Sequence, residues 1–304
     1  MRESDFIEWI CRQKEFDPAI VPVGPGDDCA MVVCGSERLL LTTDQLLDGV
    51  HFDLKTHGPK AMGRKAMARA LSDIAAMAAA PLAAVATVAL PKGFSQADAE
   101  AMYRGRRSVS DEFNCPMVGG DVGAWNGPAA VSVTVLGRSA GIQPVLRSGA
   151  KVGDAICVTG KFGGAWLSDR HLTFKPRIRE ARQLAASCSL HAMIDVSDGL
   201  ALDLSRICRA SGVGADVFAE QVPVHPNAAG GRNIDPLRAA LGDGEDYELL
   251  FTLPADQAET LVVQQPMPAR VTLIGQIVEG SNLTLVRREG NREDLKPEGW
   301  DHET

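Results

Sequence analysis

Acidic residues recur in this chain beside glycines and hydroxyl residues, at the ends of apolar runs. Asp27 and Asp28 follow a Gly-Pro-Gly turn sequence, and Asp44 follows the aliphatic run 38–43, which ends in two threonines. Hard cations such as Mg²⁺ prefer oxygen ligands of this kind. Because bound cations let an acidic protein hold a phosphate, the pattern indicates metal-assisted phosphate chemistry. Comparable clusters follow at Gly120-Asp121, Asp195-Val196-Ser197-Asp198 and Gly244-Glu245-Asp246.

Asp73 and Asp195 fit a purely structural role least well. Asp73 lies on the apolar face of an expected helix, where a carboxylate needs a partner from outside the helix unless that face is an edge open to water. Ser197 or Asp198 would cap the helix that follows, which leaves Asp195 without a capping role. The N-terminus of that helix also favours a phosphate. Both acids therefore point to cations as their partners.

The remaining clusters also admit structural interpretations. Asp27 and Asp28 could form a solvated turn, and Gly119-Gly120-Asp121 could be a plain turn rather than one whose amides approach a phosphate. Glu245 could lie in an acidic loop or at the mouth of a strand, and His51 could be a loop histidine or a phosphate contact. Acids gathered in one cleft repel one another without cations, so the clusters together favour a metal-binding cleft.

Composition and motifs exclude several other classes of protein. The net charge of -8 and the lack of a basic stripe exclude a nucleic-acid binder. The sequence has no P-loop, no protein-kinase motif set and no zinc-binding spacing of His or Cys. No apolar run reaches about 18 residues, and the acidic N-terminus is unlike a secretory signal. We therefore expect a cytoplasmic protein without a membrane partner, whose seven cysteines are buried free thiols.

Helix-like and strand-like segments alternate along the chain. The length of 304 residues suggests two domains, divided near residue 140 by a stretch rich in Gly, Ser and Pro. We expect domains at 1–140 and 141–304 and an α+β, or mixed α/β, fold. The expected helices are 3–14, 59–80, 95–113, 177–187 and 199–211. The expected strands are 38–43, 83–90, 117–118, 130–137, 154–159, 192–194, 248–253, 271–277 and 283–287.

Seven motifs occur in order along nearly the whole chain. They are Gly-Pro-Gly-Asp-Asp-Cys-Ala (24–30), Thr-Thr-Asp-Gln-Leu-Leu-Asp-Gly-Val-His-Phe (42–52), Leu-Ser-Asp-Ile-Ala-Ala-Met-Ala-Ala-Ala-Pro (71–81), Val-Gly-Gly-Asp (118–121), Arg-Ser-Gly-Ala-Lys-Val-Gly-Asp (147–154), Ile-Asp-Val-Ser-Asp-Gly-Leu (194–200) and Gly-Glu-Asp-Tyr-Glu-Leu (244–249). Together with the C-terminal Gly-Trp-Asp-His (299–302), this series resembles the thiamine-monophosphate kinase family.

The resemblance implies a fold, a partner and a reaction. The fold would be the two-domain fold of aminoimidazole ribonucleotide synthetase. The N-terminal domains of a homodimer would join through a β-barrel, with ATP near the interface. The reaction would be Mg²⁺-assisted in-line transfer of a phosphoryl group from ATP to thiamine monophosphate, which gives ADP and thiamine diphosphate. Because the acceptor is already an ionised phosphate, no general base is expected.

The resemblance also assigns residues to roles. The expected ligands of several Mg²⁺ ions are Asp28, Thr42, Thr43, Asp44, Asp73, Asp121, Asp195 and Asp198. The expected ATP contacts are Gly120, Asp121, Arg147, Ser197 and Tyr103. The expected acceptor contacts are His51, Glu245 and Trp300.

Two segments depart from the family's pattern. Gly120-Asp121 is followed by Val-Gly-Ala-Trp at 122–125, where the family usually has Thr-Thr-Arg-Gly, and the segment 161–172 is short. The departures leave two alternatives. One is an enzyme of the same fold that acts on another small phosphate or on a carboxylate, and the other is a nucleotide-binding regulatory protein without turnover.

Overall fold

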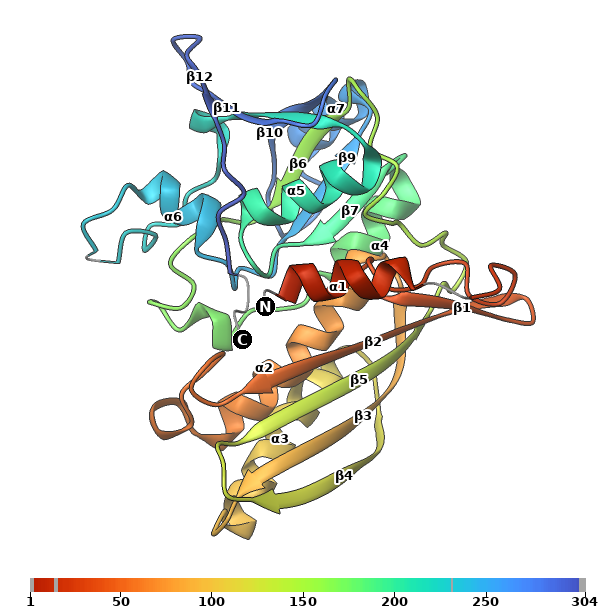
Figure 1. Ribbon diagram of the computed structural model, residues 1–304, viewed down its shortest axis with the longest axis vertical. Helices are drawn as coiled ribbons and strands as arrows, with labels where there is room; N and C mark the ends of the chain where they lie inside the picture. The colour runs from red at the N-terminus through yellow and green to blue at the C-terminus, as the bar shows by residue number, and fades with distance from the viewer. Residues whose placement is uncertain (1–2, 14–15, 231, 301–304) are drawn as a thin grey trace.

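The computed structural model describes residues 3–13, 16–230 and 232–300. Lys14 of the first expected helix, and Asp301 and His302 of the C-terminal motif, lie outside the described residues. The chain forms one sheet from its N-terminal half and one from its C-terminal half, with helix α1 (Glu3–Arg12) at their boundary (Figure 1). Among the described residues, no helix is both long and apolar enough to span a bilayer.

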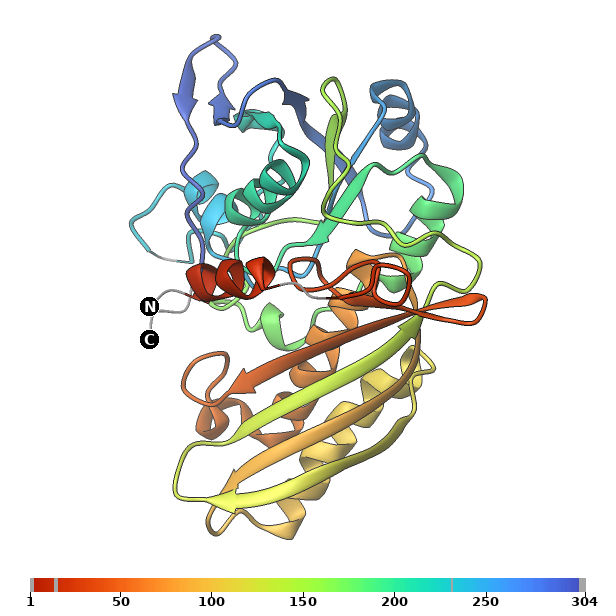
Figure 2. The ribbon, with the colours of Figure 1, turned by 45° about the vertical axis from the view of Figure 1, so that its right-hand side comes forward.

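The N-terminal domain is a five-stranded sheet with two helices on one face (Figure 2). Its elements are β1 (Ala30–Cys34), β2 (Glu37–Leu47), α2 (Leu54–Ala76), β3 (Ala80–Pro91), α3 (Gln96–Glu112), β4 (Met117–Trp125) and β5 (Ala130–Arg138). The strand order is β1-β2-β5-β3-β4, and only β3 and β4 are parallel. Alternate residues of β5 are buried, as expected when helices cover one face of a sheet.

The C-terminal domain is a seven-stranded mixed sheet. Its strands are β6 (Ala155–Thr159), β7 (Ala192–Asp195), β8 (Gly214–Phe218), β9 (Leu249–Leu253), β10 (Val271–Val278), β11 (Leu283–Val286) and β12 (Arg292–Asp294). Its helices are α4 (Ile178–Ser187), α5 (Leu200–Ser211), α6 (Pro236–Gly242) and α7 (Ala255–Gln264). The order is β12-β11-β8-β10-β6-β9-β7, so β7 is an edge strand, and it contacts α2 of the other domain.

Helix α2 is the element that both domains share. Its regular part begins at Pro59, because Gly58 has a φ of 76° and interrupts the helix. Gly63 of α2 and Gly105 of α3 lie so close to the opposite helix that an added Cβ would be 2.0 Å from a backbone carbonyl oxygen. The two helices therefore pack backbone against backbone, which fixes α2 on the N-terminal sheet.

Hydrogen bonds and apolar packing join the two domains. Arg64 of α2 donates to three successive carbonyl oxygens in residues 172–174. Arg182 of α4 donates to the carbonyl oxygens of residues 139 and 140, where the chain leaves β5. One apolar cluster extends from α2 into β7 and β9. The position of β7 relative to α2 is thus set by contacts outside the cavity described below.

The strand expected at 117–118 is present but longer than expected, and the turn expected at Gly119-Gly120-Asp121 is wrong. These residues continue β4, which pairs in parallel with β3 as far as Trp125. Gly120 lies so close to β3 that an added Cβ would be 2.0 Å from the Ala86 carbonyl oxygen. The two glycines therefore allow close strand packing rather than a turn. The other expected helices and strands are present with shifted ends, whereas β1, β8, β12, α6 and α7 have no expected counterpart.

The cysteines match their expectation only in part. All seven are free thiols, and Cys29, Cys115, Cys157 and Cys208 are buried. Cys34, at the end of the edge strand β1, is exposed, so the expectation of a buried thiol is wrong there.

Replacing Gly105 with alanine should destabilise the protein, because the new methyl group would lie 2.0 Å from the Lys60 carbonyl oxygen. Overpacking of this kind costs about 1–3 kcal/mol or more. Urea denaturation followed by circular dichroism measures the free energy of unfolding. Ser108→Ala, at an exposed position of the same helix, is the matched control. Equal stabilities of the two variants would contradict the backbone contact.

Candidate active site

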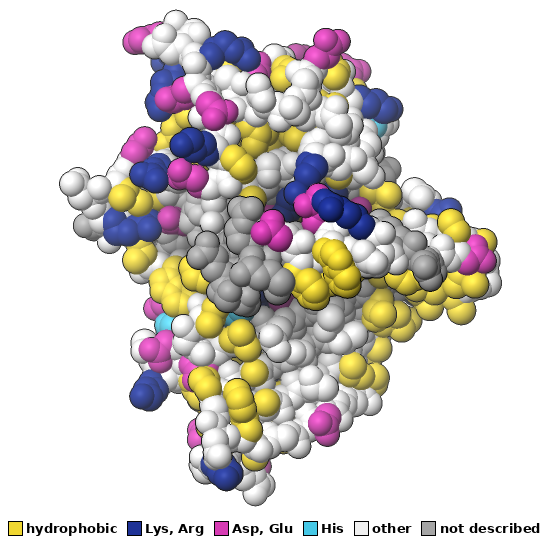
Figure 3. All heavy atoms as spheres, viewed as in Figure 1, with side chains coloured by type: hydrophobic (Ala, Val, Ile, Leu, Met, Phe, Trp, Pro, Cys, Tyr) yellow, Lys and Arg dark blue, Asp and Glu magenta, His cyan; other side chains and the backbone are white. Residues whose placement is uncertain are grey.

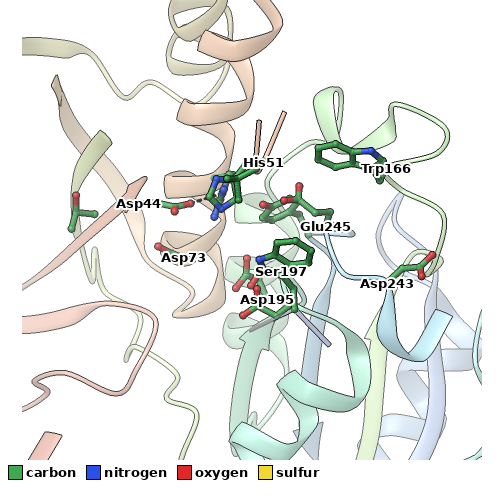
Figure 4. Close-up of a pocket in the computed structure, with 14 residues that line it drawn as sticks. Asp44, His51, Asp73, Trp166, Asp195, Ser197, Asp243 and Glu245 are labelled. Carbon is green, nitrogen blue, oxygen red and sulfur yellow. Dashed lines mark ion pairs between the residues drawn. The ribbon is translucent and has the colours of Figure 1, made fainter. Parts of the chain in front are cut away.

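A cavity of about 270 Å³ is lined by residues of both domains. Figure 4 shows Asp44 and Asp73 on the N-terminal side of this cavity, with Asp195, Ser197 and Glu245 across from them. The walls come from β2, the loop after it, α2, the segment 161–172, the junction of β7 and α5, the loop before β9, and Trp300. Of the expected site residues, the cavity is lined by Thr43, Asp44, His51, Asp73, Asp195, Ser197, Asp198, Glu245 and Trp300.

Three carboxylates from separate segments meet at the wall of this cavity. Asp28 precedes β1, Asp73 lies in α2 and Asp195 ends β7, and one oxygen of each lies within 4.8 Å of the others. Thr42 Oγ1 donates to Asp73 at 2.5 Å, and Ser72 Oγ donates to Asp195 at 2.5 Å. Within the part of the chain that the structure describes, Asp28 Oδ2 is buried without a hydrogen-bond partner. This acid triad can offer several oxygens to one cation.

Burial and mutual repulsion raise the pKa values of the acid triad. Burial raises the pKa of Asp195 from 3.8 to about 8, and the charge of Asp28 adds to the shift. Burial, and then the charge of Asp195, raise the pKa of Asp73 well above its ordinary value. The folded protein without metal therefore keeps a proton that the unfolded chain releases, so its stability falls as the pH rises from 3.8 to about 8. A divalent cation would remove this penalty, which makes the triad a fitting metal site.

Arg147 connects the acid triad to the linker between the two sheets. Its Nη2 atom lies 2.6 Å from Asp28 Oδ1, and its backbone N–H donates to Asp27 Oδ2 at 3.2 Å. Asp28 is 8% exposed. The interpretation of Asp27 and Asp28 as a solvated turn is therefore wrong for Asp28, because the linker covers it.

Two further arginines neutralise acids at the cavity. Arg69 Nε, on α2, lies 2.8 Å from Asp44 Oδ2. Arg206 Nη1, on α5, lies 2.7 Å from Asp198 Oδ2. Each of these acids is thus held in place by a cation from a neighbouring helix, and neither arginine is among the expected site residues.

Lys65 is a fully buried residue of α2 that is also absent from the expected site. Its ammonium group meets three acceptors from three different loops: Glu245 Oε2 at 2.5 Å, the His51 carbonyl oxygen at 2.5 Å and His171 Nδ1 at 2.8 Å. The sequence carries a signal for this role, because Lys65, Arg69 and Asp73 recur every four residues and therefore share one face of a helix. The lysine fixes the loops that bear two expected acceptor contacts.

The junction of β7 and α5 differs from the expectation that Ser197 or Asp198 caps the helix. The N-cap is Gly199, and the buried carboxylate of Asp203 accepts hydrogen bonds from the backbone N–H groups of Asp198 and Gly199 at 3.1 and 3.2 Å. Asp203 thus satisfies the backbone N–H groups of the N-cap and of the residue before it, whereas a capping side chain would accept from the second or third residue of the helix. The side chains of Ser197 and Asp198 line the cavity instead.

Tyr103, Gly120 and Asp121 lie apart from the other expected site residues. They line a separate surface hollow formed by α3, β3 and β4. Gly120 lies three strands away from Asp44 in the sheet, because the paired residues across it are Asp44–Val133, Val133–Ala86 and Ala86–Gly120. Three strand spacings amount to about 14 Å. Asp121 therefore does not line the cavity of its own chain.

Two family models match most of the chain. AIR synthase related protein, N-terminal domain, matches residues 26–139, and AIR synthase related protein, C-terminal domain, matches residues 151–288. The expectation of a two-domain, mixed α/β fold of this type is thereby confirmed.

Individual relatives are similar over nearly their full length. The chain is 38% identical to the thiamine-monophosphate kinase of Rhodopirellula baltica, over 99% of this chain and 97% of that protein. It is 35% identical to the enzyme of that name from Mycobacterium tuberculosis, over 90% of this chain and 84% of that protein. It also resembles the solved structure of AaThiL complexed with AMPPCP and TMP, with a TM-score of 0.85 and 29% identity over 99% of this chain and 97% of that one. The chain therefore belongs to the thiamine-monophosphate kinase family of AIR synthase related proteins.

Proposed function

We propose that this protein transfers the terminal phosphoryl group of ATP to thiamine monophosphate, which gives ADP and thiamine diphosphate. The observation that carries the proposal is the acid triad, whose oxygens lie within 4.8 Å of one another at a cavity that His51 and Glu245 also line. The names of the relatives support thiamine monophosphate as the acceptor. One relative was solved with TMP and with AMPPCP, an ATP analogue, and this complex supports both thiamine monophosphate and ATP as substrates.

Magnesium fits the donor set of the cavity. The triad combines an unpartnered carboxylate oxygen of Asp28 with two acids whose pKa values are raised by burial and repulsion. Hydroxyl and carboxylate oxygens are the ligands that Mg²⁺ prefers. When bound, Mg²⁺ neutralises the charge of the phosphates and orients them for transfer. The residues of one subunit that would hold the ions are Asp28, Thr42, Thr43, Asp44, Asp73, Asp195 and Asp198.

The other residues of the site bind and position the two substrates. Because the attacking oxygen belongs to an ionised phosphate, transfer needs no general base from the protein. Arg147 and Ser197 are assigned to ATP, and the ion pair of Arg147 with Asp28 couples that contact to the acid triad. His51, Glu245 and Trp300 are assigned to the acceptor. All three line the cavity.

The altered segments 122–125 and 161–172 do not displace these residues. Residues 122–125 belong to β4, away from the cavity of their own chain, and the segment 161–172 contributes Trp166 to the same cavity that Asp44, Asp73 and Asp195 line. We therefore favour thiamine monophosphate over another small phosphate or a carboxylate, and an enzyme over a regulatory protein without turnover.

The N-terminal sheet has two uncovered edges. β1 pairs with residues 37–41 of β2, so within the described residues the segment 42–47 of β2 has a neighbour on one side only. β4 is the opposite edge, where Val118 and Val122 are 66% and 72% exposed. Figure 3 shows hydrophobic side chains and few charged ones over this sheet. Exposed apolar edges of this kind favour pairing with another chain.

A two-fold homodimer would satisfy both edges at once. If β4 of one subunit pairs with the segment 42–47 of the partner's β2, the two sheets close into a barrel. The segment 42–47 carries Asp44 and β4 carries Asp121. This pairing would therefore bring Asp121, with Gly120 and Tyr103, to the cavity of the other subunit, and each ATP site would be shared between subunits.

Purified protein with ATP, Mg²⁺ and thiamine monophosphate should form thiamine diphosphate, measured by chromatography. Asp44→Asn should lower kcat about 100-fold or more, since it removes one expected metal ligand. Glu37→Gln removes an exposed acid from the same strand and is the control. A folded wild-type protein that binds ATP without forming thiamine diphosphate would contradict the proposed function. Normal turnover by Asp44→Asn would remove Asp44 from the metal set.

Magnesium should raise the melting temperature of the wild-type protein, and by more at pH 8 than at pH 6, because the cation replaces protons that the triad loses across this range. Asp73→Asn should melt higher than the wild type without metal, because asparagine stays neutral without taking up a proton, and it should respond less to Mg²⁺, because it lacks the carboxylate. Glu259→Gln, an exposed acid on α7, should keep the full response. An unchanged response in Asp73→Asn would rule out Asp73 as a ligand.

Mixing Asp44→Asn with Asp121→Asn should restore activity if the sites are shared. Random exchange of subunits makes half of the dimers mixed, and each of these has one intact site, so about a quarter of wild-type activity should return. Mixing Asp44→Asn with Asp73→Asn is the control, since both residues belong to the same subunit's share of the site. Recovery in the control, or none in the first mixture, would contradict the shared site.

A further inference from the structure

Trp166 is a large aromatic residue that the assigned site does not use. It lies in the segment 161–172, is 44% exposed, and lines the cavity. Figure 4 shows Asp44 and Asp73 on one side of the cavity and Trp166 on the other, with Glu245 between them. An acceptor whose phosphate lies at the acids would therefore extend its organic part toward Trp166.

The indole ring of Trp166 is supported on one face by a buried histidine. The ring centroids of Trp166 and His171 are 4.5 Å apart, and the ring planes differ by 19°. His171 is fully buried, and its Nδ1 atom lies 2.8 Å from Lys65 Nζ. Lys65 Nζ also lies 5.4 Å from the indole centroid, within range of a cation–π contact. The opposite face of the indole is the one that a ligand in the cavity can contact.

The loop that carries the indole is anchored to the C-terminal domain. The backbone N–H groups of Gly163 and Gly164 donate to the carboxylates of Asp246 and Asp243, each at 3.0 Å. Both glycines have positive φ, and an added Cβ would lie 2.8 Å and 2.2 Å from backbone atoms. A ring held in this way loses little conformational freedom when it binds a ligand.

The neighbouring histidines support the ring rather than hold a metal. His57, Asp169 and His171 lie within metal-binding distance of one another. However, His57 Nδ1 accepts a hydrogen bond from the backbone N–H of Asp53, and His171 Nδ1 accepts one from Lys65. The proton of each neutral ring is therefore on Nε2, so this atom is a donor and not a metal ligand.

We propose that Trp166 is a substrate-binding residue that stacks on the aromatic heterocycle of the acceptor and thereby selects acceptors that carry one. The inference rests on the proposed function, because thiamine monophosphate supplies planar aromatic rings at the end of the molecule away from its phosphate. Stacked aromatic rings attract one another beyond the area that they bury. A small phosphate or carboxylate without such a ring would gain nothing from this contact.

Steady-state kinetics of Trp166→Ala and Trp166→Phe test the proposal. Trp166→Ala should raise the KM for thiamine monophosphate about tenfold or more. It should leave kcat and the KM for ATP within about twofold of the wild type, because stacking acts on acceptor binding. Trp166→Phe should retain most of the affinity. Leu167→Ala is the matched control, since Leu167 is 46% exposed on the same loop and does not line the cavity.

Tryptophan fluorescence gives a second readout. Because Trp300 also lines the cavity, the measurement uses the Trp300→Phe background. Thiamine monophosphate should quench the fluorescence of that protein, and adding Trp166→Phe should remove most of this quenching while the acceptor still binds. An unchanged KM in Trp166→Ala overturns the assignment, as does undiminished quenching in Trp166→Phe if the alanine variant does not fold. A wild-type protein that forms no thiamine diphosphate would overturn the proposed function as well. An active wild type with an unchanged alanine variant overturns only the role of Trp166.

Discussion

Asp28, Asp73 and Asp195 bring three negative charges within 4.8 Å of one another at a buried position. Charges so placed repel one another and lose hydration, so the folded chain must hold protons or cations there. The ion pair of Asp28 with Arg147 and the hydrogen bonds from two hydroxyl groups offset only part of this cost. The arrangement therefore weakens the metal-free protein and strengthens its affinity for divalent cations, which is the property that phosphate transfer between two anions requires.

Rigid packing around α2 holds the three acids in place against this repulsion. The close approach of Gly63 to Met102 and of Gly105 to Lys60 fixes the helix on its own sheet, and the contact with β7 fixes it against the C-terminal domain. Because Asp73 belongs to α2 and Asp195 to β7, the two acids cannot move apart unless this interface opens. Stability gained in apolar packing away from the cavity is thus used to hold like charges together inside it.

Local patterns predicted much of the fold and part of the site. The ends of α3 and α5 and the strands β5 and β6 follow from apolar spacing and turn residues, which are local properties. Asp73 could be singled out because a carboxylate on an apolar helix face needs a partner, but its partner Thr42 lies 31 residues away. That contact depends on tertiary packing, and so does the length of β4, which β3 determines. The contact of Asp203 with the backbone N–H groups of residues 198 and 199 is different, because it spans only four and five residues and is therefore local.

Lys65 joins the loops of His51, His171 and Glu245 through one ammonium group. Because one ammonium group bonds to acceptors from all three loops, the loops depend on one another. A substitution in any of these loops changes the surroundings of the same ammonium, so its effect depends on what the other two loops carry, and the energies of combined substitutions will not add. Acceptor specificity in this enzyme can therefore change only when the three loops change together. A loop transplanted from a relative would have to be transplanted together with the other two.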